Sequence, residues 1–260
     1  MPGQEATLYE VREGAAWITL NRPEARNALS AVLVNEVFAH LEAANSDDKV
    51  RSIVLTGSGS AFCSGADLRS PPGELVAGQQ AITYPDLLNA ILESSKPVIT
   101  AVNGPAFAGG IGLVAAADIA ITSSEALYSF SEVRIGVIPA VIAVVCVPKM
   151  GRHHTMKLFL TGERFNGENA VNMQLAHRAV PAGELMNAVR EEIDMINLGG
   201  PLAVQEAKKL VRRVDELSIA EGFEETGPWS KRLFESEEGT EGMAAFREKR
   251  KPKWVEENAS

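Results

Sequence analysis

The chain has 260 residues, of which 45% are hydrophobic and 23% charged, so it can bury a sizeable core without cross-links. Its 34 acidic and 25 basic side chains give a formal net charge of -9, which argues against a large nucleic-acid-binding surface. The two cysteines, Cys63 and Cys146, are too few for a disulfide framework and are predicted to be reduced core thiols.

Neither export nor membrane association is expected. Residues 1–10 lack the positively charged start and apolar stretch of a secretory signal. The longest apolar run, 135–147, is interrupted by Pro139 and is shorter than the roughly 20 residues of a membrane helix. We therefore expect a cytoplasmic protein.

Residues 1–182 are predicted to form a core domain in which strands alternate with helices. A helix is expected behind Ser30, a plausible cap, and a short helix at 110–117. The expected strands are a hairpin at 7–20 around Glu13-Gly14, and single strands at 52–56, 98–102 and 119–122. The order strand, strand, helix recurs, which indicates an α/β fold.

Residues 183–260 are predicted to be a helical region that serves oligomerisation. The expected helices are 184–198, 201–214, 218–234 and 238–249. Within the core domain, the segment Ser70–Pro85 lies between the expected strands 52–56 and 98–102. It is rich in proline and glycine, so it is predicted to be a mobile loop.

Two glycine-rich segments that follow strands are predicted to hold the chemistry. They are Gly57–Leu68 and Asn103–Leu113. Small residues let the backbone approach a ligand closely, and an N–H group at a helix start carries partial positive charge. Two such N–H groups that converge on one oxygen make an oxyanion hole. Two ordinary tight turns are the structural alternative.

A dinucleotide-binding site is a rival interpretation of the second segment. Residues 110–115 match the pattern G-x-G-x-x-A, with Glu132 about 20 residues further on, as in nicotinamide-dependent oxidoreductases. In that motif the glycine turn follows the strand at once, whereas residues 103–109 intervene here. The spacing therefore favours the oxyanion hole.

Histidine and cysteine add no further chemistry in this interpretation. The pair His153-His154 lacks the H-E-x-x-H spacing and the carboxylate partner of a metal site, so no metal is expected. No base is indicated beside Cys63, which favours a packing role over a nucleophilic one.

Five segments in order along nearly the whole chain resemble the crotonase, or enoyl-CoA hydratase/isomerase, superfamily. They are 20–29 (LNRPEARNAL), 61–68 (AFCSGADL), 96–104 (KPVITAVNG), 131–136 (SEVRIG) and 242–250 (GMAAFREKR). The resemblance implies a crotonase-like spiral of ββα units with a C-terminal helical trimerisation region, and a homotrimer or dimer of trimers. It also implies an acyl-CoA thioester substrate and no cofactor, because coenzyme A is part of the substrate.

The same resemblance assigns roles to individual residues. It implies that the N–H groups of Ala66 and Gly109 hold the thioester oxygen and that Glu132 delivers a proton to C2. Apolar neighbours such as Phe130 and Ile135 are expected to raise the pKa of Glu132. The other residues implied in substrate binding are Glu24, Ala25, Arg26, Ser64, Asp67, Leu68, Arg69, Gly112, Phe246 and Lys249.

Gly112 stands where a hydratase of this family has its first carboxylate, and glycine cannot accept a proton. A hydratase-type lyase would therefore need another group to orient water, for which the candidates are Glu74, Asp86 and Glu93. A 3,2-enoyl-CoA isomerase would need Glu132 alone, and a non-catalytic acyl-CoA binder would need no proton transfer.

Segments 109–113 and 131–142 resemble the branch of methylglutaconyl-CoA and related branched-chain hydratases. An enoyl-CoA hydratase of fatty-acid or branched-chain acyl-CoA metabolism is therefore the leading prediction.

Overall fold

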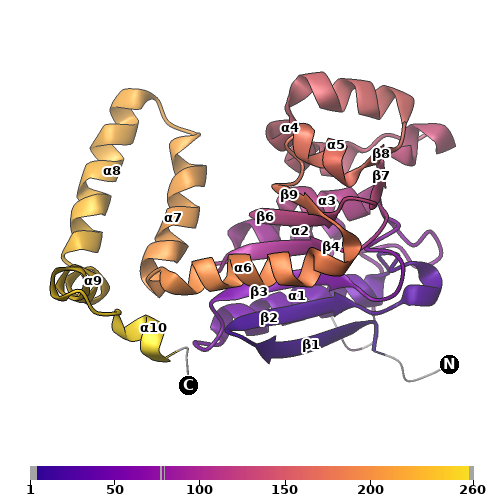
Figure 1. Ribbon diagram of the computed structural model, residues 1–260. Coiled ribbons are helices and arrows are strands. Elements are labelled where there is room, and N and C mark those ends of the chain that lie inside the picture. Colours follow the sequence, from indigo (N-terminus) through magenta and orange to yellow (C-terminus); the bar gives the residue numbers. More distant parts are fainter. Residues whose placement is uncertain (1–4, 77, 79, 258–260) are drawn as a thin grey trace.

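The computed structural model describes residues 5–76, 78 and 80–257, and Figure 1 shows sheets covered by helices with a helical arm to one side. The strands are β1 Thr7–Arg12, β2 Ala15–Leu20, β3 Ser52–Gly57, β4 Val98–Val102, β5 Ala106–Phe107, β6 Ile119–Ser123, β7 Leu127–Ser129, β8 Phe165–Asn166 and β9 Arg178–Val180. The α-helices are α1 Ala31–Ser46, α2 Tyr84–Glu93, α3 Gly109–Ala116, α4 Ala140–Thr161, α5 Gly167–Asn172, α6 Leu185–Leu198, α7 Pro201–Val214, α8 Ile219–Phe234, α9 Glu237–Glu248 and α10 Lys253–Glu257. Short 3-10 helices are η1 Pro23–Ala25, η2 Ser131–Ile135 and η3 Ala182–Glu184.

The larger sheet has the strand order β1-β2-β3-β4-β6-β9. Strands β1 and β2 pair antiparallel, and the following neighbours pair parallel. In the β1–β2 turn, Glu13 and Gly14 have φ angles of 55° and 72°, as a two-residue hairpin turn requires. The smaller sheet, β5-β7-β8, begins with the strand that leads directly into α3.

Helices cover both faces of the larger sheet, and alternate strand residues point into two separate cores. Ile53 and Leu55 of β3 belong to the core under α1, α2 and α3, whereas Val54 belongs to the core under α6. Figure 1 shows α6 lying along the sheet. Because the parallel strands are buried on both faces, they appear in the sequence as continuous apolar runs.

The predicted recurrence of strand, strand and helix is confirmed by β1-β2-α1, β4-β5-α3 and β6-β7-α4. The predicted cap is also confirmed, because the Ser30 side chain accepts the N–H of Leu33 at the start of α1.

Helices α2 and α4 were not predicted. Pro148 and the positive φ of 73° at Gly151 interrupt α4, which obscures a helical pattern in its sequence. The predicted loop 70–85 ends early because Thr83 and Asp86 form a capping box that starts α2. Residues 77 and 79 of that loop lie outside the described residues.

The predicted carboxy-terminal helices are confirmed as α6 to α9, with ends that shift by one residue at most. Helices α7 and α8 leave the sheet as an arm (Figure 1), and neither contains a buried residue. Polar contacts join the two helices. Arg213 pairs with Glu225 at 2.8 Å, and Glu206 accepts the indole N–H of Trp229 at 2.8 Å.

Within the described residues, no helix is both long and apolar enough to cross a membrane. The same residues contain no group of three or more histidine, cysteine or acidic side chains that could hold a metal ion. Both cysteines are free and buried, as predicted.

Candidate active site

The segment after β3 and the start of α3 lie side by side. The Leu29 N–H donates to the Gly65 carbonyl at 2.8 Å, which fixes the peptide that carries the Ala66 N–H. A Cβ atom at Gly65 would lie 3.0 Å from the Cβ of Ala108 and 3.5 Å from the nitrogen of Gly109. The two predicted oxyanion-hole donors therefore belong to neighbouring stretches of backbone.

The N–H groups of Ala66 and Gly109 find no hydrogen-bond acceptor within the residues that the structure describes. Gly109 is the first residue of α3, and the first N–H groups of a helix have no acceptor inside it. Ala108 has φ 48° and ψ -119°, a conformation that costs energy for an L-residue and that clusters at functional sites. Both donors remain available to a ligand.

Glu132 lies in η2, which follows β7. Its Oε2 atom is buried and has no hydrogen-bond partner among the described residues. Burial raises the pKa of Glu132, as predicted, although a backbone hydrogen bond partly opposes the shift. Phe130 is fully buried, but Ile135 is 68% exposed and does not enclose the carboxylate within this chain. The Oε2 atom is therefore free, among the described residues, to accept a hydrogen bond from a ligand.

Most of the predicted CoA-binding residues are brought together by contacts between η1 and the segment after β3. The Ser64 N–H donates to the Arg26 carbonyl at 3.0 Å, and Asp67 forms an ion pair with Arg22 at 3.0 Å. A backbone hydrogen bond from Arg69 is the main cause that lowers the pKa of Asp67, and Arg22 adds to it. The residues gathered in this way are Glu24, Ala25, Arg26, Ser64, Asp67, Leu68 and Arg69.

A cavity of about 540 Å³ adjoins η1. Its walls are mainly polar and small side chains, contributed by Ala6, Asn21, Arg22, Glu24, Ser30, Val32 and Ser70. Glu24 therefore lines the cavity and also belongs to the predicted CoA-binding set. Two other lining residues are next to that set: Arg22 pairs with Asp67, and Ser70 follows Arg69 in the sequence.

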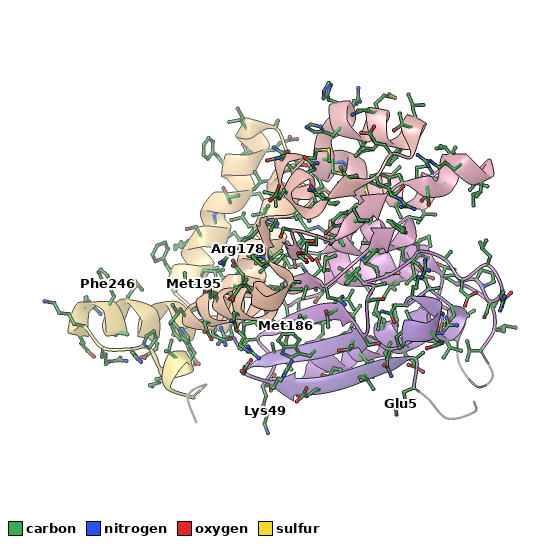
Figure 2. The ribbon with its side chains drawn as sticks, turned by 45° about the vertical axis from the view of Figure 1, so that its right-hand side comes forward. Glu5, Lys49, Arg178, Met186, Met195 and Phe246 are labelled. Carbon is green, nitrogen blue, oxygen red and sulfur yellow. The ribbon has the colours of Figure 1, made fainter. Side chains whose placement is uncertain are left out.

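The structure does not bring Phe246 and Lys249 to the other predicted CoA-binding residues of the same chain. Both lie at the end of α9, which follows the arm of α7 and α8 (Figure 1), and the Phe246 side chain is 86% exposed. Figure 2 shows Phe246 on the side of the molecule away from the larger sheet. The sequence could not reveal this separation, because it depends on how far the arm extends.

Position 112 has no room for a carboxylate side chain. A Cβ atom at Gly112 would lie 2.5 Å from both the Tyr84 hydroxyl oxygen and the Cγ2 atom of Ile142. The Tyr84 hydroxyl donates a hydrogen bond to the Gly109 carbonyl in the first turn of α3. Burial raises the pKa of Tyr84 well above its usual value, with smaller contributions from neighbours that include Glu132.

Tyr84 is therefore a site residue that the sequence interpretation missed. The predicted loop 70–85 includes it, although the pattern Thr83-x-x-Asp86 with Pro85 signals a helix start. That pattern could have placed Tyr84 at the start of a helix, but not beside α3.

The acidic residues predicted to orient water are engaged or exposed. The Asp86 carboxylate accepts the N–H and the hydroxyl of Thr83, at 2.9 and 2.6 Å. Glu93 pairs with Arg212 at 3.1 Å, and Glu74 is exposed in the loop. The prediction for Asp86 and Glu93 was wrong, because helix capping and an ion pair with the arm occupy these carboxylates.

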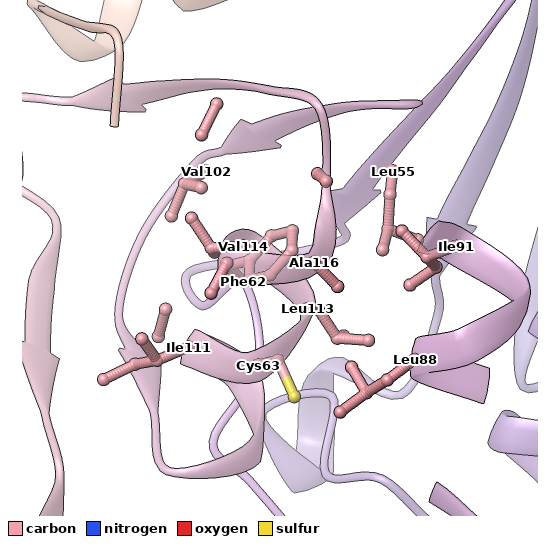
Figure 3. Packing of buried hydrophobic residues seen from close by; sticks show 14 of the residues in the cluster. Leu55, Phe62, Cys63, Leu88, Ile91, Val102, Ile111, Leu113, Val114 and Ala116 are labelled. Atoms are coloured by element: carbon pink, nitrogen blue, oxygen red, sulfur yellow. The ribbon is translucent and has the colours of Figure 1, made fainter. Parts of the chain in front are cut away.

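The dinucleotide-binding alternative is also wrong. Residues 110–115 lie inside α3 rather than in a turn after a strand, and all six are buried. Figure 3 shows Ile111, Leu113 and Val114 packed among side chains that include Leu88 and Cys63. A pyrophosphate cannot reach backbone that is enclosed in this way. Burial also raises the pKa of Cys63 to about 12, which supports its packing role.

Known proteins resemble this chain in sequence and in structure over nearly its whole length. The sequence matches the family Enoyl-CoA hydratase/isomerase over residues 10–257. It is 36% identical to a carnitinyl-CoA dehydratase of Proteus mirabilis, over 91% of this chain and 93% of that protein. It is 32% identical to an enoyl-CoA hydratase of Mycobacterium tuberculosis, over 94% of each. The crystal structure of an enoyl-CoA hydratase of Mycobacterium smegmatis has a TM-score of 0.87 and 29% identity, over 96% of this chain and 99% of that chain.

The crowding at position 112 predicts that Gly112→Glu lowers the free energy of unfolding. We expect a loss of about 2–4 kcal/mol, because overpacking and an unpaired buried carboxylate both destabilise the folded state. Denaturant unfolding measures the change. Gly183→Glu is the matched control, since nothing lies within 4 Å of a Cβ atom there. Equal stability of the two variants would contradict the crowding.

Proposed function

Because the chain belongs to the enoyl-CoA hydratase/isomerase family, we propose that it adds water across the C2–C3 double bond of a 2-enoyl-CoA and removes it in reverse. One observation carries the proposal. The backbone N–H groups of Ala66 and Gly109 and the buried Oε2 of Glu132 all lack partners among the described residues. The similar proteins include one named as a hydratase and one named as a dehydratase, which are two directions of such a reaction.

In the proposed mechanism, the two N–H groups bind the thioester oxygen. Their partial positive charge stabilises the enolate more than the ground-state carbonyl, because the negative charge on the oxygen grows as C3 is attacked. The strained Ala108 fixes the direction of the Gly109 N–H before substrate binds, so little reorganisation is needed. The hydratases of this family use no cofactor.

Glu132 carries the proton in both halves of the proposed reaction. The ionised carboxylate takes a proton from water while the resulting hydroxide oxygen bonds to C3. The C2–C3 π electrons move toward the thioester and give an enolate at the N–H pair. The enolate then collapses, and C2 takes the proton from Glu132. Water thus supplies the hydroxyl at C3 and the new hydrogen at C2, and Glu132 ends ionised.

Coenzyme A is proposed to lie along η1 and the segment after β3. Backbone and side-chain groups of Glu24, Ala25 and Arg26 face this path together with those of Ser64, Asp67, Leu68 and Arg69. Support comes from the contacts that gather them and from the adjoining cavity. Gly112 is proposed to contribute to substrate binding through Tyr84, because the Tyr84 hydroxyl and Ile142 fill the space beside it.

A homotrimer or dimer of trimers is also proposed. Helices α7 and α8 have no buried residue, yet they carry exposed apolar side chains such as Val211, Ile219 and Phe223. A face of this kind is stabilised when another copy covers it. In such an assembly, Phe246 and Lys249 reach CoA that is bound to a neighbouring copy. Residues 183–260 then act as the oligomerisation region.

The proposed reaction is tested by incubating the protein with crotonyl-CoA, methylglutaconyl-CoA and a 3-enoyl-CoA. Loss of conjugated-thioester absorbance with a gain of one water is expected. Glu132→Gln should abolish this turnover and leave the affinity for the CoA ester nearly intact, because the N–H pair and the CoA contacts remain.

Other outcomes of the same assay identify other functions. Rising absorbance at constant mass would identify a 3,2-enoyl-CoA isomerase that uses Glu132 alone. Tight binding without any chemical change would identify an acyl-CoA binder. Preference for methylglutaconyl-CoA tests the predicted branch, which stays a prediction, as does the cytoplasmic location.

The hydration rate is expected to fall as pH drops through the pKa of Glu132, since only the ionised carboxylate can take a proton from water. Burial raises this pKa above the ordinary value of 4.5, so the fall begins at a higher pH than for an exposed glutamate. A profile of kcat/KM against pH gives the midpoint. An acid-side midpoint at or below the ordinary value would contradict the role of Glu132.

The proposed assembly predicts a trimer or hexamer in sedimentation equilibrium, and dissociation in the variant Phe223→Glu. Phe223 is 76% exposed in the single chain, so a charge there affects contact with another copy rather than the fold. Leu8→Glu, at an exposed site on β1, is the control and should leave the mass unchanged. A monomeric wild-type protein would contradict the assembly.

A further inference from the structure

Hydration needs more than a base, because the attacking water must present a lone pair to C3. A water whose two hydrogens are bound by two acceptors has its lone pairs directed elsewhere, toward the reacting atom. Glu132 provides one acceptor in the proposed function. Gly112 provides none, Asp86 and Glu93 are engaged by Thr83 and Arg212, and Glu74 is exposed in the loop. The second acceptor has to come from another residue.

We infer that the hydroxyl oxygen of Tyr84 is this second acceptor and that it holds the attacking water against the Glu132 carboxylate. The inference rests on the proposed hydration reaction. It makes Tyr84 a water-positioning residue, and it assigns Gly112 the role of leaving space for the phenol.

The position of the Tyr84 hydroxyl supports the inference. The hydroxyl oxygen lies 2.5 Å from where a Cβ atom at position 112 would lie. By the family resemblance, position 112 is where a hydratase has its first carboxylate. A Cβ atom at Gly109 would lie 3.6 Å from Cε1 and Cζ of Tyr84, so the ring packs directly against the backbone of the oxyanion-hole residue. The negative charge of Glu132 is near enough to oppose ionisation of the phenol.

The hydrogen bond of Tyr84 determines what the hydroxyl can do. Its hydrogen is donated to the Gly109 carbonyl, so toward a water molecule the oxygen acts as an acceptor. A phenolic oxygen has two lone pairs. The N–H of Leu113 approaches one of them, and the inference assigns the other to the water.

The raised pKa of Tyr84 separates its role from that of Glu132. Burial keeps the phenol neutral at pH values where the Glu132 carboxylate is ionised. Tyr84 therefore accepts a hydrogen bond from water without taking its proton, and the proton passes to Glu132. The atoms balance as in the two-step addition described above, with no extra reactant.

The start of α2 fixes the ring. Helix α2 begins at Tyr84, and the capping box of Thr83 and Asp86 holds that first turn with a 2.6 Å hydrogen bond between their side chains. A positioning residue on a capped helix is held more firmly than one on an open loop.

The test compares Tyr84→Phe with the matched control Tyr128→Phe, and it uses two reactions. Tyr128 is also buried, and its substitution by phenylalanine likewise removes one hydrogen bond, the one that its hydroxyl donates to Thr122 at 2.6 Å. It lies in β7, outside the proposed site. The first reaction is hydration of crotonyl-CoA. The second is exchange of the C2 hydrogens of butyryl-CoA in deuterated water, which needs the N–H pair and Glu132 but no nucleophilic water.

Tyr84→Phe is expected to lower kcat for hydration on the order of 100-fold, with KM and C2 exchange changed by no more than about twofold. Tyr128→Phe should leave both reactions as in the wild type. Unchanged hydration in Tyr84→Phe would overturn the inference. So would an equal loss of hydration and exchange, because Tyr84 would then only support the start of α3. Failure of the wild type to hydrate any 2-enoyl-CoA is a different result, which removes the proposed function and this inference together.

Discussion

The close approach of two backbone segments, the one after β3 and the one that begins α3, is the constraint on which the rest of the site depends. Glycine makes it possible. A Cβ atom at Gly110 would overlap the carbonyl oxygen of Cys63, and one at Gly104 would overlap that of Ser60. Hydrogen bonds from Phe107 to Cys63 and from Ala108 to Ser129 then fix the strained turn before α3. The result is a pair of N–H groups, at Ala66 and Gly109, that are held in place and left without acceptors within the described chain.

Three tasks in the proposed reaction fall to three kinds of group. Backbone N–H groups stabilise the charge on the thioester oxygen, where no proton has to move. Glu132 moves the proton, and burial raises its pKa toward the range where a carboxylate both accepts and returns one. Tyr84, neutral and with its hydrogen already donated, orients the water. In this proposal, Tyr84 takes over the water-orienting role of the first carboxylate. Glycine at position 112 is then required, because the phenol occupies the space that a carboxylate side chain would need.

Much of the fold could be predicted from the sequence, whereas contacts between distant segments could not. The hairpin at 7–20 and the cap at Ser30 depend on local chemistry and are confirmed, and the crotonase-like α/β fold is confirmed by its similarity to solved structures. Helix α4 was missed because Pro148 and Gly151 interrupt its pattern. The assignments of Asp86 and Glu93 failed because their partners, Thr83 and Arg212, are set by helix capping and by the path of the arm. Tyr84 was missed because only the folded chain brings it to α3.

The central claim is that the N–H groups of Ala66 and Gly109 bind and polarise the thioester oxygen. The most direct measurement is the infrared band of a ¹³C-labelled thioester carbonyl in crotonyl-CoA bound to Glu132→Gln, where turnover cannot obscure it. Hydrogen bonds from two fixed donors weaken the C=O bond. The carbonyl band is therefore expected at a lower frequency in the complex than in water. A band at the same or a higher frequency than in water would contradict the claim.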